Sequence, residues 1–527
     1  MSAPDLTAAS TAVDLARGVV SDAARHLAAA GAPDDHQVAL YDLAHATSAV
    51  DVSRFLLDYG TKGETEAAIA CAFIADAVHG LASTLFGREA DWGVDAGALD
   101  ATRPFVAEHR SAEFLASLAD VSPPNHLAEE YEMVADTFKR FAEERVAPHA
   151  EHVHRADADI PEEIIEGLAE IGCFGLSVPE EYDGFATGTE SDYIGMVIAT
   201  EELSRGSLGA GGSLITRPEI LTRALELGGT EVQKKHWLPQ VASGEIMNCV
   251  AVTEPDYGSD VASIKTTATP VEGGWKINGV KTWCTFAGRA DVLLLLARTD
   301  PDRSKGHRGL SMFIVPKPRA TGHAFEFTQD DGGRIEGRAI PTLGYRGMHS
   351  FEVAIEDWFV PADNLIGGED GLGRGFYYQM AGFENGRLQT AARAVGVMRA
   401  AYEQARAYAD DRVVFGSPIG EYQLTRAKLG RMVAIIAASR EYSYAVARMM
   451  ANGEGSMEAS MIKAYVCKAA EWVTREAMQI HGGFGYAEEY PVSRLFVDAR
   501  VLSIFEGADE TLCLKVIARK LVADAKA

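Results

Sequence analysis

The sequence is poor in cysteines that could act together. Its six cysteines are scattered over 527 residues, with no C-x-x-C pair and no cysteine and histidine cluster at the spacing of metal ligands. A disulfide framework and a zinc site are therefore not expected, and we assign no metal. Scattered thiols fit a reducing compartment, so we expect a cytoplasmic protein.

Long hydrophobic runs and basic clusters are also missing. No uninterrupted apolar stretch reaches the about 18 residues typical of a membrane helix, and residues 1–20 show no basic segment followed by an apolar one. The chain has 49 lysines and arginines against 76 aspartates and glutamates, a formal net charge of −27. This charge repels nucleic acid and anionic lipid, so we expect no nucleic-acid partner and no membrane association.

The glycine-rich motifs that most often bind nucleotides are absent. The sequence has no G-x-G-x-x-G joining a strand to a helix in a βαβ unit, and no Walker A pattern. The stretch GLGRG at 371–375 is interpreted as a flexible connection. Any nucleotide cofactor must therefore be held by something other than a Rossmann fold.

What is present divides into four segments of different periodicity. Residues 1–125 are alanine-rich with helical spacing and end in the breaker run DVSPPNH, and residues 126–246 continue with helical patterns. Residues 247–366 consist of short β-rich runs divided by Gly, Pro, Asn and Asp, which predicts a β domain built as a sandwich or barrel. Residues 367–527 return to long helical segments, which suggests a bundle. The predicted fold is mainly α with a central β domain.

One short segment, SIFEGADETL at 503–512, raises a functional question. It places Glu506 between an apolar run and Gly507. The acid could be a solvated residue at a helix end, because glycine is a natural helix terminator. It could also be a general base that Leu502, Ile504 and Phe505 partly desolvate, which would suit proton transfer near neutral pH. The segment alone leaves both interpretations open.

Five segments together resemble, in order and spacing, the motifs of the FAD-dependent acyl-CoA dehydrogenases. The resemblance runs from near Ala128 to the C-terminus, and residues before it lie outside the motifs. An ordered set of five motifs is far more specific than any one of them. The segments are AVTEPDYGSDVASIKTTA (251–268), WKINGVKTWCTFAGRADVLLLLART (275–299), RVVFGSPIGEYQ (412–423), MQIHGGFGYAEEYPVSRLFVDAR (478–500) and IFEGADETL (504–512).

The resemblance implies a helical domain, a β domain and a C-terminal four-helix bundle that together bind FAD. It also implies desaturation of an acyl-CoA, in which a carboxylate takes the α-proton and flavin N5 takes the β-hydrogen as hydride. Glu506 matches the most common position of that base, in the motif I-[YF]-E-G. The alternative position falls on Gly386, which carries no carboxylate. Glu384 lies on another helix face and is at most a contact to substrate or CoA.

The same resemblance implies two sets of flavin contacts. One set surrounds the isoalloxazine and pyrophosphate, and strand alternation should place Trp283 and Thr285 on one face. The other set grips the ADP half of FAD across a subunit interface, so we expect a homo-oligomer, with a dimer favoured and a tetramer possible. The first set is Val252, Thr253, Gly258, Ser259, Trp283 and Thr285; the second is Arg412, Phe415, Gln423, Gln479, Gly482 and Gly483.

Further positions are implied on the substrate side. Ser259 and Gly507 match contacts to the thioester, and Arg387 matches an arginine near the CoA-binding helix start, where a cation suits phosphate. The N-terminal extension and residues 202–220 most resemble the bacterial branch that oxidises (2S)-methylsuccinyl-CoA to mesaconyl-CoA in the ethylmalonyl-CoA pathway. The extra carboxylate of that substrate needs a cation, and Arg205 and Arg217 lie in the segment that shapes the acyl cavity of the family. Each could equally be a solvated or helix-end arginine.

Other functions stay open at this point. The substrate could be another short branched or dicarboxylic acyl-CoA, and the electron acceptor could be oxygen, as in an acyl-CoA oxidase, instead of an electron-transfer flavoprotein. A flavin-fold protein that binds DNA is disfavoured by the net charge of −27. The extension could be a protein-interaction module, or it could cap the catalytic core in place of a second dimer.

Overall fold

The computed structural model describes residues 3–526, which form two compact units. The first unit combines the chain up to Met133 with the chain from Thr390 onward, and the second comprises Val134–Gln389. The N-terminal extension therefore shares one unit with the C-terminal helices, although more than 250 residues separate them in sequence. Two helices span the division: α7 (Glu129–Phe141) begins in the first unit and continues in the second, and α13 (Gly375–Asp411) begins in the second unit and continues in the first.

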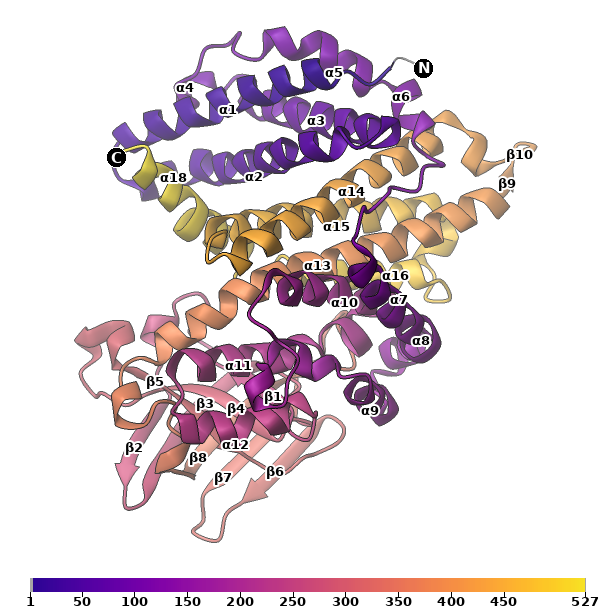
Figure 1. Ribbon diagram of the computed structural model, residues 1–527. Coiled ribbons are helices and arrows are strands. Elements are labelled where there is room, and N and C mark those ends of the chain that lie inside the picture. Colours follow the sequence, from indigo (N-terminus) through magenta and orange to yellow (C-terminus); the bar gives the residue numbers. More distant parts are fainter. Residues whose placement is uncertain (1–2, 527) are drawn as a thin grey trace. The chain divides into compact units, whose positions relative to one another are not determined.

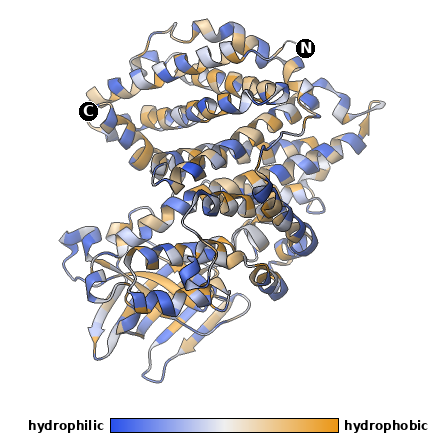
Figure 2. Ribbon diagram, in the orientation of Figure 1, coloured by the Kyte–Doolittle hydropathy of each residue, from blue (hydrophilic) through white to orange (hydrophobic). Residues whose placement is uncertain are grey.

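The first unit is almost entirely helical (Figure 1). In Figure 2 its helices carry hydrophobic and hydrophilic residues side by side, as expected when each helix buries one face. Besides the later part of α13 and the short hairpin of β9 (Val413–Val414) and β10 (Ser417–Pro418), its elements are α1 (Leu6–Ala29), α2 (Gln37–Gly60), α3 (Glu64–Leu85), α4 (Glu89–Trp92), α5 (Arg103–His109), α6 (Ala112–Ser117), α14 (Gln423–Ala451), α15 (Ser456–Ile480), α16 (Pro491–Val501), α17 (Asp509–Thr511) and α18 (Ala518–Asp524).

The extension packs directly on the bundle within this unit. Helices α2 and α3 lie against α14, and α2 also lies against α15 (Figure 1). Helix α3 is long and apolar enough, by length and composition, to cross a membrane, with 56% of that stretch buried. Because its buried residues pack against α1, α2 and α14, its composition is also that of a core helix.

The linker between the extension and the following helices is tied to α14. Arg440 donates to the carbonyls of Pro123 and Pro124, and Tyr59 of α2 donates to the same Pro124 carbonyl at 2.9 Å. The proline-containing run forms no helix or strand, so its carbonyl groups need other donors, and these hydrogen bonds supply them.

The second unit combines helices with one sheet. Besides the later part of α7 and the beginning of α13, the helices are α8 (Ala147–Ala156), α9 (Glu162–Glu170), α10 (Glu190–Gly206), α11 (Thr216–Gly228) and α12 (Glu231–Ala242). The strands are β1 (Asn248–Ala251), β2 (Thr267–Val271), β3 (Gly274–Thr285), β4 (Val292–Arg298), β5 (Leu310–Pro316), β6 (Ala324–Thr328), β7 (Arg334–Ala339) and β8 (Ser350–Pro361).

The sheet has the order β1-β4-β2-β3-β8-β7-β6, with β5 also paired to β4. β4 runs parallel to β1, and its last residue pairs in parallel with the first residue of β2; the other pairs are antiparallel. Every residue of β4 is buried, and alternate residues of β4 and β5 share one core cluster with α11 and α12. The predicted fold class, mainly α with a central β domain, is confirmed.

Candidate active site

The segment that contains Glu506 is a tight turn between two helices. α16 ends at Val501 and α17 begins at Asp509, and between them Glu506 has φ +54° and Gly507 has φ +97°. A left-handed backbone costs a residue with a side chain about 1–2 kcal/mol, so the surroundings must hold Glu506 in this conformation. The turn is therefore more than a simple helix end.

The Glu506 carboxylate is nearly buried and incompletely paired. The side chain is 9% exposed, and its Oε1 lies 3.7 Å from Nη2 of Arg393, which is fully buried. Its Oε2 is buried and accepts no hydrogen bond from any residue within 3–526. A buried oxygen without a donor is costly in a resting protein and is typical of a group that takes part in chemistry.

Buried groups fix the backbone on both sides of Glu506. Nζ of Lys463 donates to the carbonyls of Phe505 at 3.0 Å and Gly507 at 2.6 Å. The hydroxyl of Ser503 donates to Glu471 at 2.5 Å. The turn is thus attached to α15 at three points, which offsets the backbone strain of Glu506.

The second unit assembles the loop and strand predicted to meet the flavin. The N–H of Thr282 donates to the carbonyl of Thr253 at 2.8 Å, and Nζ of Lys281 donates to the carbonyl of Val252 at 3.0 Å. Lys281 is fully buried and also pairs with Glu254 at 3.0 Å. The loop at 252–259 is therefore bound to β3 next to Trp283.

Burial and charge compete at this ion pair. Burial alone would raise the pKa of the Glu254 carboxyl, but the charge of Lys281 and hydrogen bonds from Thr266 and Lys265 hold its pKa below the usual value. The carboxylate is ionised and can anchor the loop electrostatically.

Trp283 lies in a bulge of β3. Lys281 pairs with Val353 and Cys284 with Phe351, so three steps along β3 match two along β8. Trp283 has φ +56° and is 55% exposed, Cys284 is buried, and the half-buried Thr285 has its hydroxyl 3.0 Å from that of Ser350. The tryptophan ring is therefore available to a planar ligand.

The loop residues predicted to meet the pyrophosphate are accessible. Val252 is buried and Thr253 half-buried, whereas Gly258 and Ser259 are exposed. A Cβ on Gly258 would meet only the methyl of Thr253, at 3.8 Å. No protein contact therefore requires glycine at this position, and the open space suits close approach of a ligand to the backbone.

The residues predicted to hold the ADP half of FAD gather at helix ends of the first unit. Arg412 follows α13, one turn after Tyr408, whose ring stacks on His481 with centroids 4.3 Å apart. His481 directly precedes Gly482 and Gly483, so the two motifs lie together. Phe415, at the tip of the β9–β10 hairpin, is 97% exposed. Gln423, Gln479, Gly482 and Gly483 are also exposed.

The two arginines predicted near the acyl cavity differ sharply. Arg205 is ion-paired to Glu202 at 3.2 Å and to Glu143, so its charge is already neutralised. Arg217, in the first turn of α11, is 4% exposed, and the one hydrogen bond that its side chain makes within residues 3–526 is a long one of 3.4 Å to Thr216. Arg217 forms no ion pair within the described part of the chain, and its buried Nε lacks an acceptor there.

Glu384 and Arg387 are half-buried near the start of α13. Their neighbours Asn385 and Gln389 donate to the buried Glu219 of α11 at 3.2 and 2.7 Å, which fixes this part of α13 on α11. The helix thus presents Glu384 and Arg387 from a rigid support, and their contacts to substrate or CoA stay a prediction.

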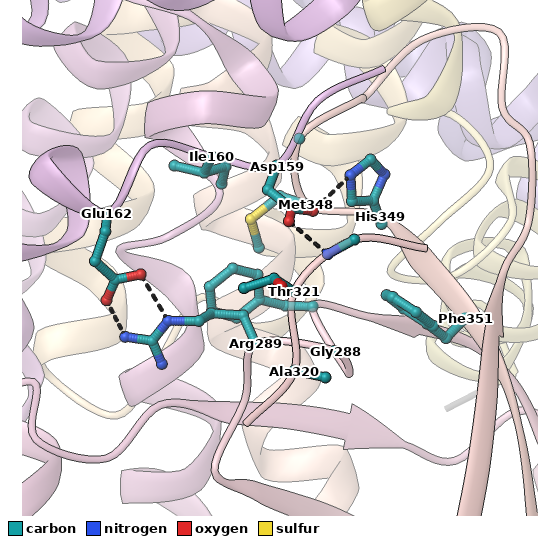
Figure 3. Close-up of a pocket in the computed structure, with 13 residues that line it drawn as sticks. Asp159, Ile160, Glu162, Gly288, Arg289, Ala320, Thr321, Met348, His349 and Phe351 are labelled. Atoms are coloured by element: carbon teal, nitrogen blue, oxygen red, sulfur yellow. Dashed lines mark hydrogen bonds and ion pairs between the residues drawn. The ribbon is translucent and has the colours of Figure 1, made fainter. Parts of the chain in front are cut away.

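A separate pocket, drawn in Figure 3, lies just beyond Thr285 along the chain, and Phe286 is among the residues that line it. In Figure 3 Glu162 is paired with Arg289, and Asp159 lies between His349 and the backbone of Gly322. A hydrogen bond from His349 lowers the pKa of Asp159, and one from Arg289 lowers that of Glu162. Both acids are ionised and already paired with bases, and the predicted site residues do not line this pocket.

The sequence interpretation missed two residues that the structure brings to Glu506. Arg393 lies in AARAVG and Lys463 in SMIKAYVC, where each is a lone cation among small or apolar residues of a helix. A charge on a buried helix face needs a partner, so this pattern could have indicated a role for both.

The residues present suit a flavin dinucleotide. An exposed tryptophan in a bulge and an exposed glycine loop lie together in one unit, and exposed Phe415 and Gly482 lie at helix ends of the other. Stacking surfaces, hydroxyls and free backbone groups are the donor set that an isoalloxazine and a pyrophosphate require.

Comparisons with known proteins identify the family. Profiles of the N-terminal, middle and C-terminal domains of acyl-CoA dehydrogenase match residues 128–245, 249–358 and 373–521. The (2S)-methylsuccinyl-CoA dehydrogenase of Cereibacter sphaeroides is 42% identical over 84% of this chain and 80% of its own length. The mitochondrial 2-methylacyl-CoA dehydrogenase of Solanum tuberosum is 35% identical over 73% and 89%.

A solved structure agrees. The complex of glutaryl-coenzyme A dehydrogenase with glutaryl-CoA superposes with a TM-score of 0.69 at 29% identity, covering 76% of this chain and 97% of that one. The predicted resemblance is confirmed. The chain belongs to the acyl-CoA dehydrogenase family and is an FAD-dependent oxidoreductase that acts on the CH–CH group of an acyl-CoA.

Proposed function

We propose that the protein oxidises (2S)-methylsuccinyl-CoA to mesaconyl-CoA, as a step of the ethylmalonyl-CoA pathway, and passes the electrons to an electron-transfer flavoprotein. The sequence identity of 42% with a (2S)-methylsuccinyl-CoA dehydrogenase is the reason for proposing this substrate. The single structural observation that carries it is the buried guanidinium of Arg217, which has no carboxylate partner among residues 3–526.

A buried arginine without a counter-ion is expensive. Removing a charge from water costs several kcal/mol unless an opposite charge or several acceptors replace the solvent. Arg217 lies in the first turn of α11, where the helix dipole adds further positive potential. A ligand carboxylate would supply the missing partner, and methylsuccinyl-CoA carries one beyond its reacting carbons. Arg205 is a poorer candidate because Glu202 and Glu143 already neutralise it.

Glu506 takes the α-proton of the thioester in this reaction. Its buried Oε2 has no donor among residues 3–526 and can receive a proton without breaking a hydrogen bond. When bound, FAD supplies the acceptor for the β-hydrogen as hydride. Trp283, Thr285 and the loop at 252–259 bind and orient the flavin ring, while the exposed groups around Phe415 and Gly482 hold the ADP half.

The exposed position of Phe415 supports a homodimer. A side chain that is 97% exposed contributes little to its own subunit, and a cofactor bound across a subunit interface would cover it. The extension covers α14 and α15, and this supports a dimer over a tetramer, because these helices are then unavailable to further subunits. Light scattering of the purified holoenzyme should give the mass of a dimer.

The decisive experiment compares two substrates that differ only in the distal group. The oxidised holoenzyme is mixed without oxygen with methylsuccinyl-CoA or with 2-methylbutyryl-CoA, which has a methyl in place of the carboxylate. We expect bleaching of the flavin by methylsuccinyl-CoA, and a loss of about a hundredfold in kcat/KM for this substrate alone in Arg217→Met, the effect of losing a buried charge pair.

Three outcomes would contradict the proposal. Equal kcat/KM of wild type and Arg217→Met for methylsuccinyl-CoA would show that Arg217 does not bind the distal carboxylate of the substrate. Faster bleaching by glutaryl-CoA or 2-methylbutyryl-CoA would support the same reaction but assign a different substrate. Rapid reoxidation of the reduced flavin by air would favour an oxidase over an electron-transfer flavoprotein as partner.

A further inference from the structure

Two residues of the N-terminal extension contact the chain three residues after Glu506. The hydroxyl of Tyr41 donates to Oδ2 of Asp509 at 2.5 Å, and Nε2 of His45 lies 3.0 Å from the same oxygen. Both side chains come from α2 and lie one helical turn apart, with their rings edge to face at 4.8 Å. Nζ of Lys468 approaches Asp509 at 3.4 Å from α15.

Asp509 is a buried, ionised anchor. Its side chain is 5% exposed. Burial would raise the pKa of its carboxyl, but hydrogen bonds from His45 and Tyr41 and the charge of Lys468 outweigh burial and lower the pKa to about 2. The carboxylate therefore stays charged at any pH at which the enzyme works, and its three partners hold it from two sides.

The same cluster could be taken for a metal site. Ligand atoms of His45, Asp509 and Cys513 lie within 4.8 Å of one another. Burial raises the pKa of the Cys513 thiol far above its usual range, and the ammonium of Lys468 repels a cation. A hydrogen-bonded network explains the geometry better, and a chelator can test this.

The anchor is connected to the base through a short, closed turn. The N–H of Asp509 donates to the carbonyl of Ser503 at 3.1 Å, which closes the turn around Glu506. Lys463 holds the carbonyls on either side of Glu506. The position of Asp509 therefore determines where the strained backbone of Glu506 sits.

We propose that Tyr41 and His45 are positioning residues for Glu506, so that the extension acts as a brace of the catalytic turn. The inference rests on Glu506 being the base of the proposed reaction. Neither residue needs to touch substrate. Together they fix the position of Asp509, Asp509 fixes the turn, and the turn keeps Glu506 in a left-handed conformation that is unfavourable when unsupported. A shift of the base by about 1 Å can cost a hundredfold in rate.

The test uses the full-length holoenzyme and whichever short acyl-CoA bleaches the wild type fastest. The variants are Tyr41→Phe with His45→Ala, and His45→Gln alone, whose amide can still donate. We expect the double variant to lower the rate constant of flavin reduction about 10- to 100-fold, with flavin content and acyl-CoA affinity unchanged. His45→Gln should stay within about threefold of wild type, because its hydrogen bond survives.

Tyr59→Phe is the matched control, because Tyr59 lies on the same helix but donates to Pro124 instead of Asp509. It should leave flavin reduction unchanged. The proposal is overturned if the double variant reduces its flavin at the wild-type rate, or if Tyr59→Phe slows reduction equally. If dialysis against EDTA lowered the rate of flavin reduction of the wild type, a metal site would explain the cluster in place of the hydrogen-bonded network. Wild-type flavin reduction in Glu506→Gln would instead refute the base assignment, which keeps the two failures distinct.

Discussion

Nη2 of Arg393 lies 3.7 Å from Oε1 of Glu506, beyond hydrogen-bond distance but close enough for a strong charge interaction. The guanidinium also stacks over the ring of Phe505, 5.0 Å from its centroid, and donates to Thr390 at 3.2 Å. The arginine thus orients the carboxylate by its field, while the buried Oε2, which accepts no hydrogen bond within residues 3–526, can receive a proton.

Removing the charge of Arg393 should slow the proton transfer. In Arg393→Met we expect the rate constant of flavin reduction to fall at least tenfold, while Arg393→Lys keeps a cation and recovers part of the rate. Stopped-flow reduction at saturating acyl-CoA measures this step. Arg440→Met, which removes another buried arginine far along α14, is the control and should reduce its flavin normally. Equal rates in Arg393→Met and wild type would exclude an electrostatic role.

The ion pair of Lys281 and Glu254 should stabilise the β domain and help to retain the flavin. Lys281→Met leaves Glu254 buried and unpaired, which costs about 3–5 kcal/mol, and it frees the carbonyl of Val252. We expect a lower urea midpoint and loss of flavin on gel filtration. The double variant Lys281→Met/Glu254→Gln has no unpaired charge and should recover most of the stability. A double variant no more stable than the single one would contradict this explanation.

Phe415 should matter for the cofactor and hardly for folding. In Phe415→Ala we expect a change in unfolding free energy within about 0.5 kcal/mol, because the ring is almost fully exposed. The Kd for FAD should rise about tenfold or more, the value of one aromatic stack. Phe86→Ala removes another highly exposed ring, directly after α3, and should leave FAD binding unchanged. Identical Kd values in both variants would exclude Phe415 from the cofactor site.

The anchor at Asp509 should give stability a defined pH dependence. Its pKa is about 2 in the folded protein and about 3.9 when unfolded, so its contribution to stability is complete above about pH 5 and is lost as the pH falls through 2. We expect the free energy of unfolding of wild type to exceed that of Asp509→Asn by about 2–3 kcal/mol at pH 6, and this difference to narrow steadily below about pH 5. Urea unfolding across this range measures it. A gap that does not vary with pH would mean that the charge is irrelevant.

Periodicity was sufficient for the fold class. The long amphipathic segments became α13, α14 and α15, and the short β-rich runs became β1 to β8 of one sheet. Local sequence could not show that the extension joins α14 and α15 in one unit, since that contact links residues hundreds of positions apart. The bulge at Trp283 was also invisible, because it depends on pairing with β8.

Residue type and spacing in the motifs were sufficient to predict Glu506, Trp283 and Phe415 as site residues, because the chemistry of a site requires particular groups in a particular order. The tertiary structure alone decided which charges are neutralised. Arg205 and Arg217 look alike in sequence, yet Arg205 is paired with two carboxylates, whereas Arg217 is buried without a carboxylate partner in the described part of the chain. The turn around Glu506 is likewise supported by side chains from helices that are distant in sequence, namely Arg393, Lys463 and Tyr41. Only the packing of these helices brings the side chains close to the turn. A sequence fixes which groups a chain carries, whereas their charge balance depends on burial and on partners that only the packed helices bring near.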